Sequence, residues 1–494
     1  MHNLAQLIER AALERPDAAF GTLEQPGRLG AAYAVAQDLA RQLRDAGLGR
    51  GSVVAFIGRT SASYLTAWMG AQCAGVQAAL INPSYPNELL REMLSDLRPA
   101  AILWVGRDPG DLLELPVRQY DGRDADAGAL RSLRTELHDS SRPPGQGRDC
   151  GRADIACYMH TSGTSGRPKF CALSHDYFLR LGRFMADTMG LSHLDTVLAP
   201  LPMFHINPLG YGLVGALTAG AGVLAAERFS ASGFWPAVKS NGVSALVLHL
   251  PPAAILKAST TRDDARGHKV RVAFGCDASF LAQFDVPIGV GGYGSTEAGG
   301  LCHSWHYRPH DEDMAKEGGF HYAGRARHDI EWAIAPNEEI LVREKRPHAV
   351  LSGYLRAGAL LSAFDDDGWF HTGDRGRRDD WGNLVFIERL SESIRVKGEY
   401  VPVDFVEERL RRIKALGDFA LWGRDAAISG QEVVIYATGS EVPAAEIREV
   451  TGDLPGFMRP AAVICVAELP RDSGVGKIQR RLLPQLAVHR EVTL

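Results

Sequence analysis

Two long stretches of the chain alternate amphipathic helical patterns with short apolar runs, and this alternation constrains the fold more than any other feature. In the first stretch, helices are predicted at 31–46, 61–74 and 88–97, and strands at 53–57, 77–81 and 101–105. In the second, strands are predicted at 196–200, 222–225, 245–248 and 270–274, with helices between them. Strands that alternate with helices form parallel sheets covered by helices. The sequence therefore predicts α/β architecture for both stretches.

The pattern changes near residue 391, after which a smaller α+β unit is predicted. Its expected strands are 394–396, 419–422, 433–437 and 462–466, and its expected helices are 403–416 and 444–450. About 100 residues is an ordinary size for a separate domain. The predicted domains are therefore residues 1–391 and residues 392–494.

Length and composition indicate a globular protein and argue against several functions. The chain has 494 residues, of which 45% are hydrophobic, and this is enough for more than one domain with its own core. The formal net charge is −5, so no basic surface for nucleic acid is expected. The seven cysteines lack C-x-x-C spacing, which is typical of reduced thiols in a cytoplasmic protein. We expect no signal peptide and no membrane span, because the longest apolar region, 208–226, is rich in glycine and continues into charged residues.

A loop rich in hydroxyl groups and glycine follows a predicted strand at 154–160. It supplies four hydroxyls, two glycines and two cations, so its backbone N–H groups can approach phosphate oxygens closely. Its spacing differs from that of the Walker P-loop. An ordinary surface turn has a similar composition, but the chain holds only nine lysines against 45 arginines, and the first lysine is in this loop. We therefore expect phosphate binding by Thr161, Ser162, Gly163, Thr164, Ser165, Gly166 and Lys169.

The loop sequence Thr-Ser-Gly-Thr-Ser-Gly-Arg-Pro-Lys resembles the phosphate loop of the adenylate-forming superfamily, which includes acyl-CoA synthetases, amino-acid adenylation domains and luciferases. Blocks similar to those of the same superfamily follow in the expected order at 293–297, 368–374, 388–398 and 469–477. The stretch 203–235 looks most like bacterial acyl-CoA ligases. The resemblance implies a large N-terminal domain of two α/β subdomains and a small β-barrel-like subdomain, followed by a small mobile α+β C-terminal domain.

The resemblance also implies roles for the residues of the block Gly-Tyr-Gly-Ser-Thr-Glu. In this family Tyr293 would stack on adenine, Thr296 would contact the phosphate and the substrate carboxylate, and Glu297 would hold Mg²⁺, for which a carboxylate is a suitable ligand. Gly275 and Cys276 are expected to line the adenine pocket. A nearby group of residues resembles metal ligands, namely Cys302, His303, His306 and His310. We expect no metal site there, because their spacing does not provide a complete set of ligands.

Two further blocks resemble the family's ribose site and its hinge. Asp374 is similar to the carboxylate that accepts both ribose hydroxyls, a task that suits a group with two acceptor oxygens. Arg389 is the second expected ribose contact. Glu392 occupies the place of the hinge acid, where aspartate is commoner in the family.

The remaining catalytic expectations concern the C-terminal unit. Lys397 and Gly398 resemble the loop that lines the pantetheine channel while the thioester forms. Lys477 matches the family's adenylation lysine, whose flexible stem and compact charge can bridge the attacking carboxylate and the α-phosphate.

The segment after the strand at 196–200 is expected to form part of the acyl pocket. His205 directly follows a predicted strand, where open α/β sheets place ligand contacts, and the resemblance makes it a wall of the acyl pocket near the forming thioester. Glycines downstream leave space that favours a bulky or long acid, although helix packing explains them equally well. They are Gly210, Gly212, Gly215, Gly299 and Gly300.

Phe170 stands directly after Lys169, where the family usually has glycine. A phenyl ring at this position could crowd a bound triphosphate, yet it would disturb a bound acyl-adenylate less. The departure therefore admits a half-enzyme, which receives a ready-made acyl-adenylate from a separate adenylating enzyme and performs only the thioester step.

These features together predict an AMP-forming acid–thiol ligase. Such an enzyme uses ATP and Mg²⁺ to convert a carboxylic acid to an acyl-adenylate, and coenzyme A then displaces AMP. The alternatives are the half-enzyme, an adenylation enzyme that loads a carrier protein, and a catalytically silent binding protein of the same fold. We expect a monomer or homodimer, and the arginine- and alanine-rich composition is typical of bacteria with natural-product biosynthesis.

Overall fold

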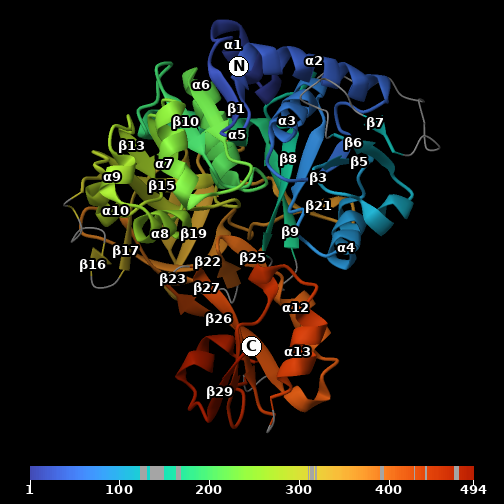
Figure 1. The fold of residues 1–494 in the computed structure, drawn as a ribbon, viewed down its shortest axis with the longest axis vertical. Helices are drawn as coiled ribbons and strands as arrows, with labels where there is room; N and C mark the ends of the chain where they lie inside the picture. The colour runs from blue at the N-terminus through green and yellow to red at the C-terminus, as the bar shows by residue number, and fades with distance from the viewer. Residues whose placement is uncertain are drawn as a thin grey trace. The chain divides into compact units, whose positions relative to one another are not determined.

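The computed structural model describes residues 1–122, 131–133, 149–162, 168–309, 311, 316–317, 320–389, 394–427, 429–439, 442–471 and 478–494. They form two compact units (Figure 1). Unit 1 comprises residues 1–83, 91–160 and 170–388, and unit 2 comprises residues 84–90, 161–169 and 389–494. The predicted domain boundary after residue 391 lies outside the described residues.

The first sheet contains the parallel strands expected in the first hundred residues. The strands expected at 53–57, 77–81 and 101–105 form β3, β4 and β5, and β3 pairs in parallel with both neighbours. Helices α2 (Leu29–Asp45), α3 (Ala62–Ala74) and α4 (Asn87–Leu97) alternate with these strands. The described strands of this sheet follow the order β21 (Ala359–Leu361), β20 (Gly353–Arg356), β9 (Pro168–Ser174), β8 (Ile155–Ser162), β4 (Gln77–Ile81), β3 (Val53–Gly58), β5 (Ala101–Val105), β6 (Arg118–Asp121) and β7 (Arg131–Ser132).

Helix α3 illustrates how the local sequence sets an element of this sheet. Ser61 caps the helix by accepting a hydrogen bond from the backbone N–H of Tyr64, and Gly75 ends it with a φ of +83°, a conformation that glycine adopts without strain. Every residue from Ser63 to Ala74 is buried. A helix that is buried on all sides needs small or apolar residues all round, and α3 has them except at Gln72, whose side-chain amide donates to the carbonyl of Ala156.

The second sheet is larger and changes from parallel to antiparallel along its length. The parallel part contains the strands expected at 196–200, 222–225, 245–248 and 270–274, and strand β1 joins it by pairing in parallel with β11. From β14 onward the pairing is antiparallel. The described order is β18 (Ile330–Ile334), β19 (Glu339–Glu344), β22 (Phe370–Arg378), β23 (Leu384–Arg389), β17 (Phe320–Ala326), β15 (Gly300–Tyr307), β14 (Gly289–Ser295), β13 (Val272–Phe274), β12 (Ala245–Val247), β10 (Thr196–Ala199), β11 (Gly222–Ala225), β1 (Ala19–Thr22) and β2 (Pro26–Arg28), with β16 (Lys316–Glu317) beside β17.

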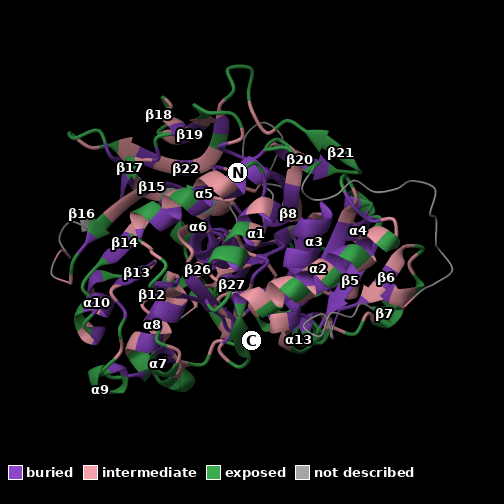
Figure 2. Cartoon of the chain, turned by 90° about the horizontal axis from the view of Figure 1, so that it is seen from above, coloured by how far each residue is buried: buried purple, intermediate pink, exposed green. Residues whose placement is uncertain are grey.

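Helices cover the parallel parts of the two sheets of unit 1, and the buried residues concentrate in the strands and on the inner helix faces (Figure 2). The helices include α1 (Leu4–Glu14), α5 (His175–Thr188), α6 (Gly215–Ala219), α7 (Ala231–Ser240), α8 (Leu250–Ser259), α9 (Arg262–Ala265) and α10 (Ala278–Phe284). A π-helix over Asn207–Val214 precedes α6. All seven cysteines are buried, and none forms a disulfide bond within the described residues. No helix in the described part of the chain has the length and apolar character needed to cross a membrane.

Unit 2 contains the predicted α+β elements. A hairpin of β24 (Ile394–Val396) and β25 (Glu399–Val401) precedes a sheet of β26 (Phe419–Ala426), β27 (Gly430–Ala437), β28 (Ala462–Cys465) and β29 (Arg490–Thr493), with helices α12 (Val403–Leu410) and α13 (Ala444–Thr451). The helix expected at 403–416 ends at Leu410. Ile413 adopts an extended conformation there, and the chain turns so that both Ile413 and Leu416 become buried.

Candidate functional site

Tyr293 and Asp374 come from separate sequence blocks, and the fold brings them together in unit 1. Tyr293 lies on β14 and Asp374 on β22, and the Tyr293 hydroxyl donates a hydrogen bond of 2.8 Å to Oδ2 of Asp374. Both side chains are buried, with 8% and 4% exposure. Burial, together with the negative charge of Asp374, raises the pKa of Tyr293 well above its usual range. Tyr293 therefore stays protonated and donates to the carboxylate.

The stretch of β22 before Asp374 is shaped by glycine and by side-chain hydrogen bonds. Gly373 has a φ of +68°, and its N–H donates to Oε1 of Glu339 at 2.9 Å. The Thr372 hydroxyl accepts a hydrogen bond from the Asp374 N–H and donates to the carbonyl of Ile340. These contacts fix the backbone of β22 at the point from which the Asp374 side chain projects.

Aromatic rings pack next to Tyr293, and two of the aromatic residues in this group, Phe386 and Trp332, were not expected from the sequence. Its ring is stacked against Phe386, with centroids 5.9 Å apart and an interplanar angle of 24°. His303 lies opposite Tyr293 in the β14–β15 register, and Trp332 meets His303 edge to face at 5.0 Å. The Arg378 guanidinium lies over Trp332 at 3.8 Å. Phe386 and Trp332 come from strands remote in sequence, so only the sheet order could have revealed them.

The group of cysteine and histidines near this strand does not converge on one point. Cys302 Sγ contacts the carbonyl of Tyr293 at 3.4 Å and Nδ1 of His303 at 3.3 Å, whereas His306 Nε2 bonds to the carbonyl of Thr188. Burial, with a contribution from the charge of Arg378, lowers the pKa of His303 to about 3. His310 lies outside the described residues. Among the residues that are described, no group of three or more His, Cys, Asp or Glu side chains could hold a metal ion.

Gly275 and Cys276 form the turn between β13 and α10. Gly275 has a φ of +73°, and a Cβ at this position would lie 2.6 Å from the carbonyl oxygen of Leu248, so the close approach of two backbones requires glycine. Cys276 is buried, and its carbonyl accepts a hydrogen bond from the Tyr307 hydroxyl. Burial raises the pKa of the Cys276 thiol well above its usual range.

Thr296 and Glu297 follow directly after β14, and neighbouring groups hold their backbone. The Tyr177 hydroxyl donates to the carbonyl of Thr296 at 2.9 Å, and the Leu351 N–H donates to the carbonyl of Glu297 at 3.1 Å. The Glu297 side chain is half-buried, and its Oε1 lies 3.5 Å from the Tyr354 hydroxyl. The backbone is thus fixed while the carboxylate keeps partial access to solvent.

His205 follows β10 and is half-buried in an aromatic group. Its ring centroid lies 4.6 Å from that of Phe204, which in turn is stacked against His160 at 6.0 Å. Burial and the nearby His205 lower the pKa of His160 to about 3. The neutral His160 accepts a hydrogen bond from the N–H of Asn82 through Nε2.

The phosphate loop is only partly described. Thr161 is buried at the end of β8, Ser162 is the last residue of that strand, and Lys169 is half-buried on β9. Four of the predicted phosphate contacts lie outside the described residues, namely Gly163, Thr164, Ser165 and Gly166.

In unit 2, Lys397 and Gly398 form the turn of the β24–β25 hairpin. Both have positive φ, of 55° and 86°, as a two-residue hairpin turn requires. The Lys397 N–H donates to the carbonyl of Ser429 at 2.7 Å, and its side chain is exposed. Open space surrounds the position that a Cβ on Gly398 would occupy.

Two further predicted residues of this part of the chain, Glu392 and Lys477, lie outside the described residues, and Arg389 ends β23. The residues that flank segment 472–477 pair with one another. Arg471 and Ile478 form an antiparallel bridge, and the Gln479 N–H donates to the carbonyl of Pro470 at 2.7 Å. Arg480 also forms an ion pair with the buried carboxylate of Glu407 at 2.7 Å.

Comparison with known proteins identifies the family. Residues 29–346 match the family of AMP-binding enzymes. The chain belongs to this family.

Among its relatives, the chain is 28% identical to the oxalate–CoA ligase of Arabidopsis thaliana over 98% of each chain. It is 26% identical to the medium/long-chain-fatty-acid–CoA ligase FadD6 of Mycobacterium tuberculosis over 89% of this chain and 78% of that protein. Its fold is similar to that of a double mutant of the o-succinylbenzoate CoA synthetase of Bacillus subtilis bound to a product analogue, with a TM-score of 0.82, 22% identity and coverage of 100% and 99%. The same synthetase in complex with ATP and magnesium ion has a TM-score of 0.66, with 22% identity over 97% of this chain and 99% of that one.

Membership of the AMP-binding enzymes confirms the resemblance to the adenylate-forming superfamily. It also confirms the expected enzyme class, an AMP-forming acid–thiol ligase. The likeness to the synthetase confirms the predicted fold class. The roles of individual site residues remain predictions.

Phe170, the departure from the AMP-binding family's usual glycine, is buried. It lies on β9 opposite Leu355 of β20, and its side chain is 1% exposed. The ring therefore packs in the protein interior, which removes the steric reason for expecting a defective phosphate loop.

The glycines expected to enlarge the acyl pocket of this AMP-binding enzyme are closely packed. A Cβ on Gly212 would lie 2.5 Å from Cβ of Ala199, and Cβ atoms on Gly210 and Gly300 would lie 2.7 and 2.6 Å from Cδ2 of Leu181. A Cβ on Gly299 would lie 2.5 Å from the carbonyl oxygen of Ala349, and a Cβ on Gly215 would lie 3.3 Å from Cβ of Met185. Close packing therefore accounts for these glycines, and the space they leave is filled.

Proposed function

We propose that this AMP-binding enzyme joins a carboxylic acid to the thiol of coenzyme A through an acyl-adenylate. The observation that carries the proposal is the buried hydrogen bond from Tyr293 to Asp374, because it joins two predicted nucleotide contacts at one place. A carboxylate has about four lone-pair sites, so Asp374 can accept from Tyr293 and from ribose hydroxyls. The relatives named above are CoA ligases, and the synthetase that shares the fold binds ATP with magnesium. These likenesses support ATP, Mg²⁺ and coenzyme A as the cofactors.

In the first half-reaction, a carboxylate oxygen of the acid attacks the α-phosphorus of ATP and pyrophosphate leaves. Bound Mg²⁺ supplies positive charge that offsets the triphosphate charge. Glu297 suits this ion, because Mg²⁺ usually keeps several waters and takes only one or two protein carboxylates. Tyr293 and Asp374 bind the adenosine, and Lys477 bridges the acid and the α-phosphate as charge develops.

In the second half-reaction, the sulfur of coenzyme A attacks the acyl carbon and AMP leaves. We assign the Lys397–Gly398 turn to the thiol channel, since it is an exposed hairpin turn in which glycine presents no side chain. The C-terminal domain, residues 392–494, would exchange Lys477 for this turn by rotation about Glu392. His205, at the end of β10, is assigned to the wall of the acyl pocket.

The proposed acid is bulky or long, as it is for the medium/long-chain-fatty-acid ligase among the relatives. A short acid is the second candidate. It is favoured by the packing of Gly210, Gly212 and Gly300, whose space neighbouring side chains already fill, and by the likeness to the oxalate–CoA ligase. Both candidates use the same two-step chemistry.

The proposal is tested by incubating the purified protein with ATP, Mg²⁺, coenzyme A and a panel of acids from acetate and oxalate to aromatic and long-chain acids. We expect acyl-CoA and AMP to form together with at least one acid, and Lys477→Ala to form neither. Transfer to a carrier protein but not to coenzyme A would identify the carrier-loading alternative. Absence of both products with every acid would contradict the proposal. Supplied acyl-adenylates would then separate the two remaining alternatives, since the half-enzyme converts them to acyl-CoA and the silent binding protein does not.

A further inference from the structure

Arg327 is a fully buried cation next to the segment that carries Glu297. It lies between β17 and β18, its exposure is 1%, and its guanidinium is 5.8 Å from the ring centre of Phe184 on helix α5. The guanidinium donates to the carbonyls of Gly299 at 2.7 Å and Ala349 at 2.8 Å, with a longer contact to the carbonyl of Leu301 at 3.4 Å. The carbonyls of Gly299 and Leu301 belong to the turn that follows Glu297. The carbonyl of Ala349 belongs to the segment after β19 that also contacts Glu297.

The Gly299–Gly300 turn and Arg327 fit each other closely. Both glycines have positive φ, of +92° and +75°. A Cβ on Gly299 would lie 2.9 Å from Nη2 of Arg327 and 2.5 Å from the carbonyl oxygen of Ala349. The space that glycine leaves here is thus occupied by the guanidinium, and the turn cannot shift without disturbing these hydrogen bonds.

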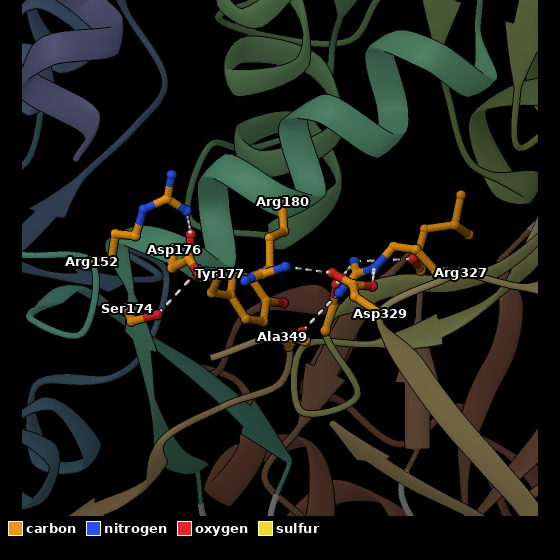
Figure 3. Close-up of polar contacts among 10 residues, drawn as sticks. Arg152, Ser174, Asp176, Tyr177, Arg180, Arg327, Asp329 and Ala349 are labelled. Carbon is orange, nitrogen blue, oxygen red and sulfur yellow. Dashed lines mark hydrogen bonds and ion pairs between the residues drawn. The ribbon is translucent and has the colours of Figure 1, made fainter. Parts of the chain in front are cut away.

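A chain of alternating charges holds Arg327 from the other side (Figure 3). Nε of Arg327 donates to Oδ1 of Asp329 at 2.5 Å, and Oδ2 of Asp329 lies 3.5 Å from Nη1 of Arg180 on α5. Arg180 also binds Asp176 at 2.8 Å, and Asp176 in turn binds Arg152. Helix α5 also carries Tyr177, whose hydroxyl donates to the carbonyl of Thr296.

The energetics favour a positioning role over a simple stabilising one. Removing a buried ion pair from water offsets most of its Coulombic attraction, so well-packed apolar residues of the same volume often stabilise a fold as well. What the guanidinium adds is direction, because its donors form a rigid planar fork. Here that fork fixes three carbonyls around the segment that leads away from Glu297.

We propose that Arg327 is a positioning residue for Glu297, with Tyr177 holding the other side of the same segment. This inference rests on the proposed function, in which Glu297 carries Mg²⁺ during adenylation and has no task in the thioester step. Disturbing Arg327 or Tyr177 therefore weakens adenylation and its response to Mg²⁺, and leaves thioester formation from a supplied acyl-adenylate largely intact.

Four variants test the proposal. Arg327→Met removes the fork, and Tyr177→Phe removes one hydroxyl without disturbing a buried charge, so it remains informative if Arg327→Met does not fold. Arg271→Met is the control for the arginine, at a site where the side chain is 40% exposed. Arg271 also binds a buried carboxylate, Asp195 at 2.7 Å, and a backbone carbonyl, that of Gly190 at 2.7 Å, but it does not contact segment 296–301. Tyr64→Phe is the control for the tyrosine, because the buried Tyr64 hydroxyl has no hydrogen-bond partner in the described structure.

Amide hydrogen exchange provides a readout that does not depend on activity. We expect faster exchange in residues 296–301 for Arg327→Met and Tyr177→Phe, and unchanged exchange there for Arg271→Met and Tyr64→Phe. In pyrophosphate exchange, misplacing a catalytic group lowers rates by about tenfold to a hundredfold, and the Mg²⁺ concentration for half-maximal activity should rise in the same two variants. Unchanged amide exchange in 296–301, or equal loss of both half-reactions with an unchanged Mg²⁺ response, would overturn the inference. A wild-type protein that performs neither half-reaction would instead contradict the proposed function, and the amide exchange would still decide the role of Arg327.

Discussion

Replacing Tyr293 with phenylalanine tests whether the Tyr293–Asp374 contact fixes the proposed ribose carboxylate. The substitution removes one oxygen and keeps the ring that stacks against Phe386. In the wild-type protein the hydroxyl donates a hydrogen bond of 2.8 Å to the Asp374 carboxylate, and both groups are buried. Hydrogen bonds to charged groups contribute about 1.5–3 kcal/mol to stability. We therefore expect Tyr293→Phe to lower the free energy of unfolding of unit 1 by about 2 kcal/mol.

Tyr64→Phe is the matched control, since it makes the same chemical change at another buried tyrosine. The Tyr64 side chain is 1% exposed, and its hydroxyl has no hydrogen-bond partner in the described part of the chain. Removing a buried hydroxyl that lacks a partner relieves a desolvation cost. We expect Tyr64→Phe to leave stability unchanged or to raise it slightly.

Urea unfolding of both variants, followed by tryptophan fluorescence with and without saturating AMP, makes the comparison. AMP binding to the folded state raises the unfolding midpoint by mass action. Tyr293→Phe should therefore both lower the midpoint in the absence of AMP and reduce the AMP-induced rise. Tyr64→Phe should not lower the midpoint and should leave the AMP-induced rise unchanged. If the two variants unfolded alike, with and without AMP, the Tyr293 hydroxyl would have no role in holding Asp374 for a nucleotide.

Three further predictions follow from specific features of the two units. Burial lowers the pKa of His303 and His160 to about 3 and that of His175 to about 4. The unfolded chain therefore binds more protons than the folded one between pH 4 and 6.5, and the free energy of unfolding should rise by about 2 kcal/mol per histidine from pH 5 to pH 7. Urea unfolding at the two pH values checks this, and equal or greater stability at pH 5 would contradict it. Gly212→Ala should destabilise unit 1 by about 1–3 kcal/mol, because the Cβ of the alanine would lie 2.5 Å from Cβ of Ala199. Thermal unfolding measures this loss. An unchanged melting temperature together with a narrower range of accepted acids would show that Gly212 enlarges the acyl pocket instead. Lys477→Ala should abolish adenylation and spare thioester formation from a supplied adenylate. Gly398→Ala should do the reverse, because a side chain at this position, whose φ of +86° favours glycine, would narrow the proposed thiol channel. Separate assays of the half-reactions test this pair, and equal loss of both in each variant would rule out the two-step division of labour.

Much of the architecture was predictable from local patterns. The strands at 77–81, 101–105, 222–225 and 394–396 have the predicted bounds, and the first three are short apolar runs between helical patterns. What the sequence could not reveal was long-range pairing. Strand β1 joins the second sheet beside β11, and the antiparallel strands from β15 to β18 continue that sheet. Such pairings depend on contacts between residues far apart in the chain.

In the candidate site, too, the features set by local sequence were predictable and those set by tertiary contacts were not. The motif at 292–297 and Asp374 could be recognised from short sequence blocks, and the fold places Tyr293 against Asp374. Arg327 could not be recognised, because its meaning depends on the carbonyls of Gly299 and Ala349, which only the tertiary structure brings to it. Phe170 and Gly212 were ambiguous for a related reason. A sequence specifies the size of a side chain, but burial and neighbours decide whether that size affects a site.

The central claim is that this protein itself activates a carboxylic acid with ATP. The most direct test measures ATP–pyrophosphate exchange and the conversion of synthetic acyl-adenylates to acyl-CoA in parallel, over one panel of acids. Because the Phe170 ring is buried, we predict that the acid whose adenylate is converted fastest also supports vigorous pyrophosphate exchange. Conversion of the adenylate without exchange for any acid would contradict the claim and identify the half-enzyme.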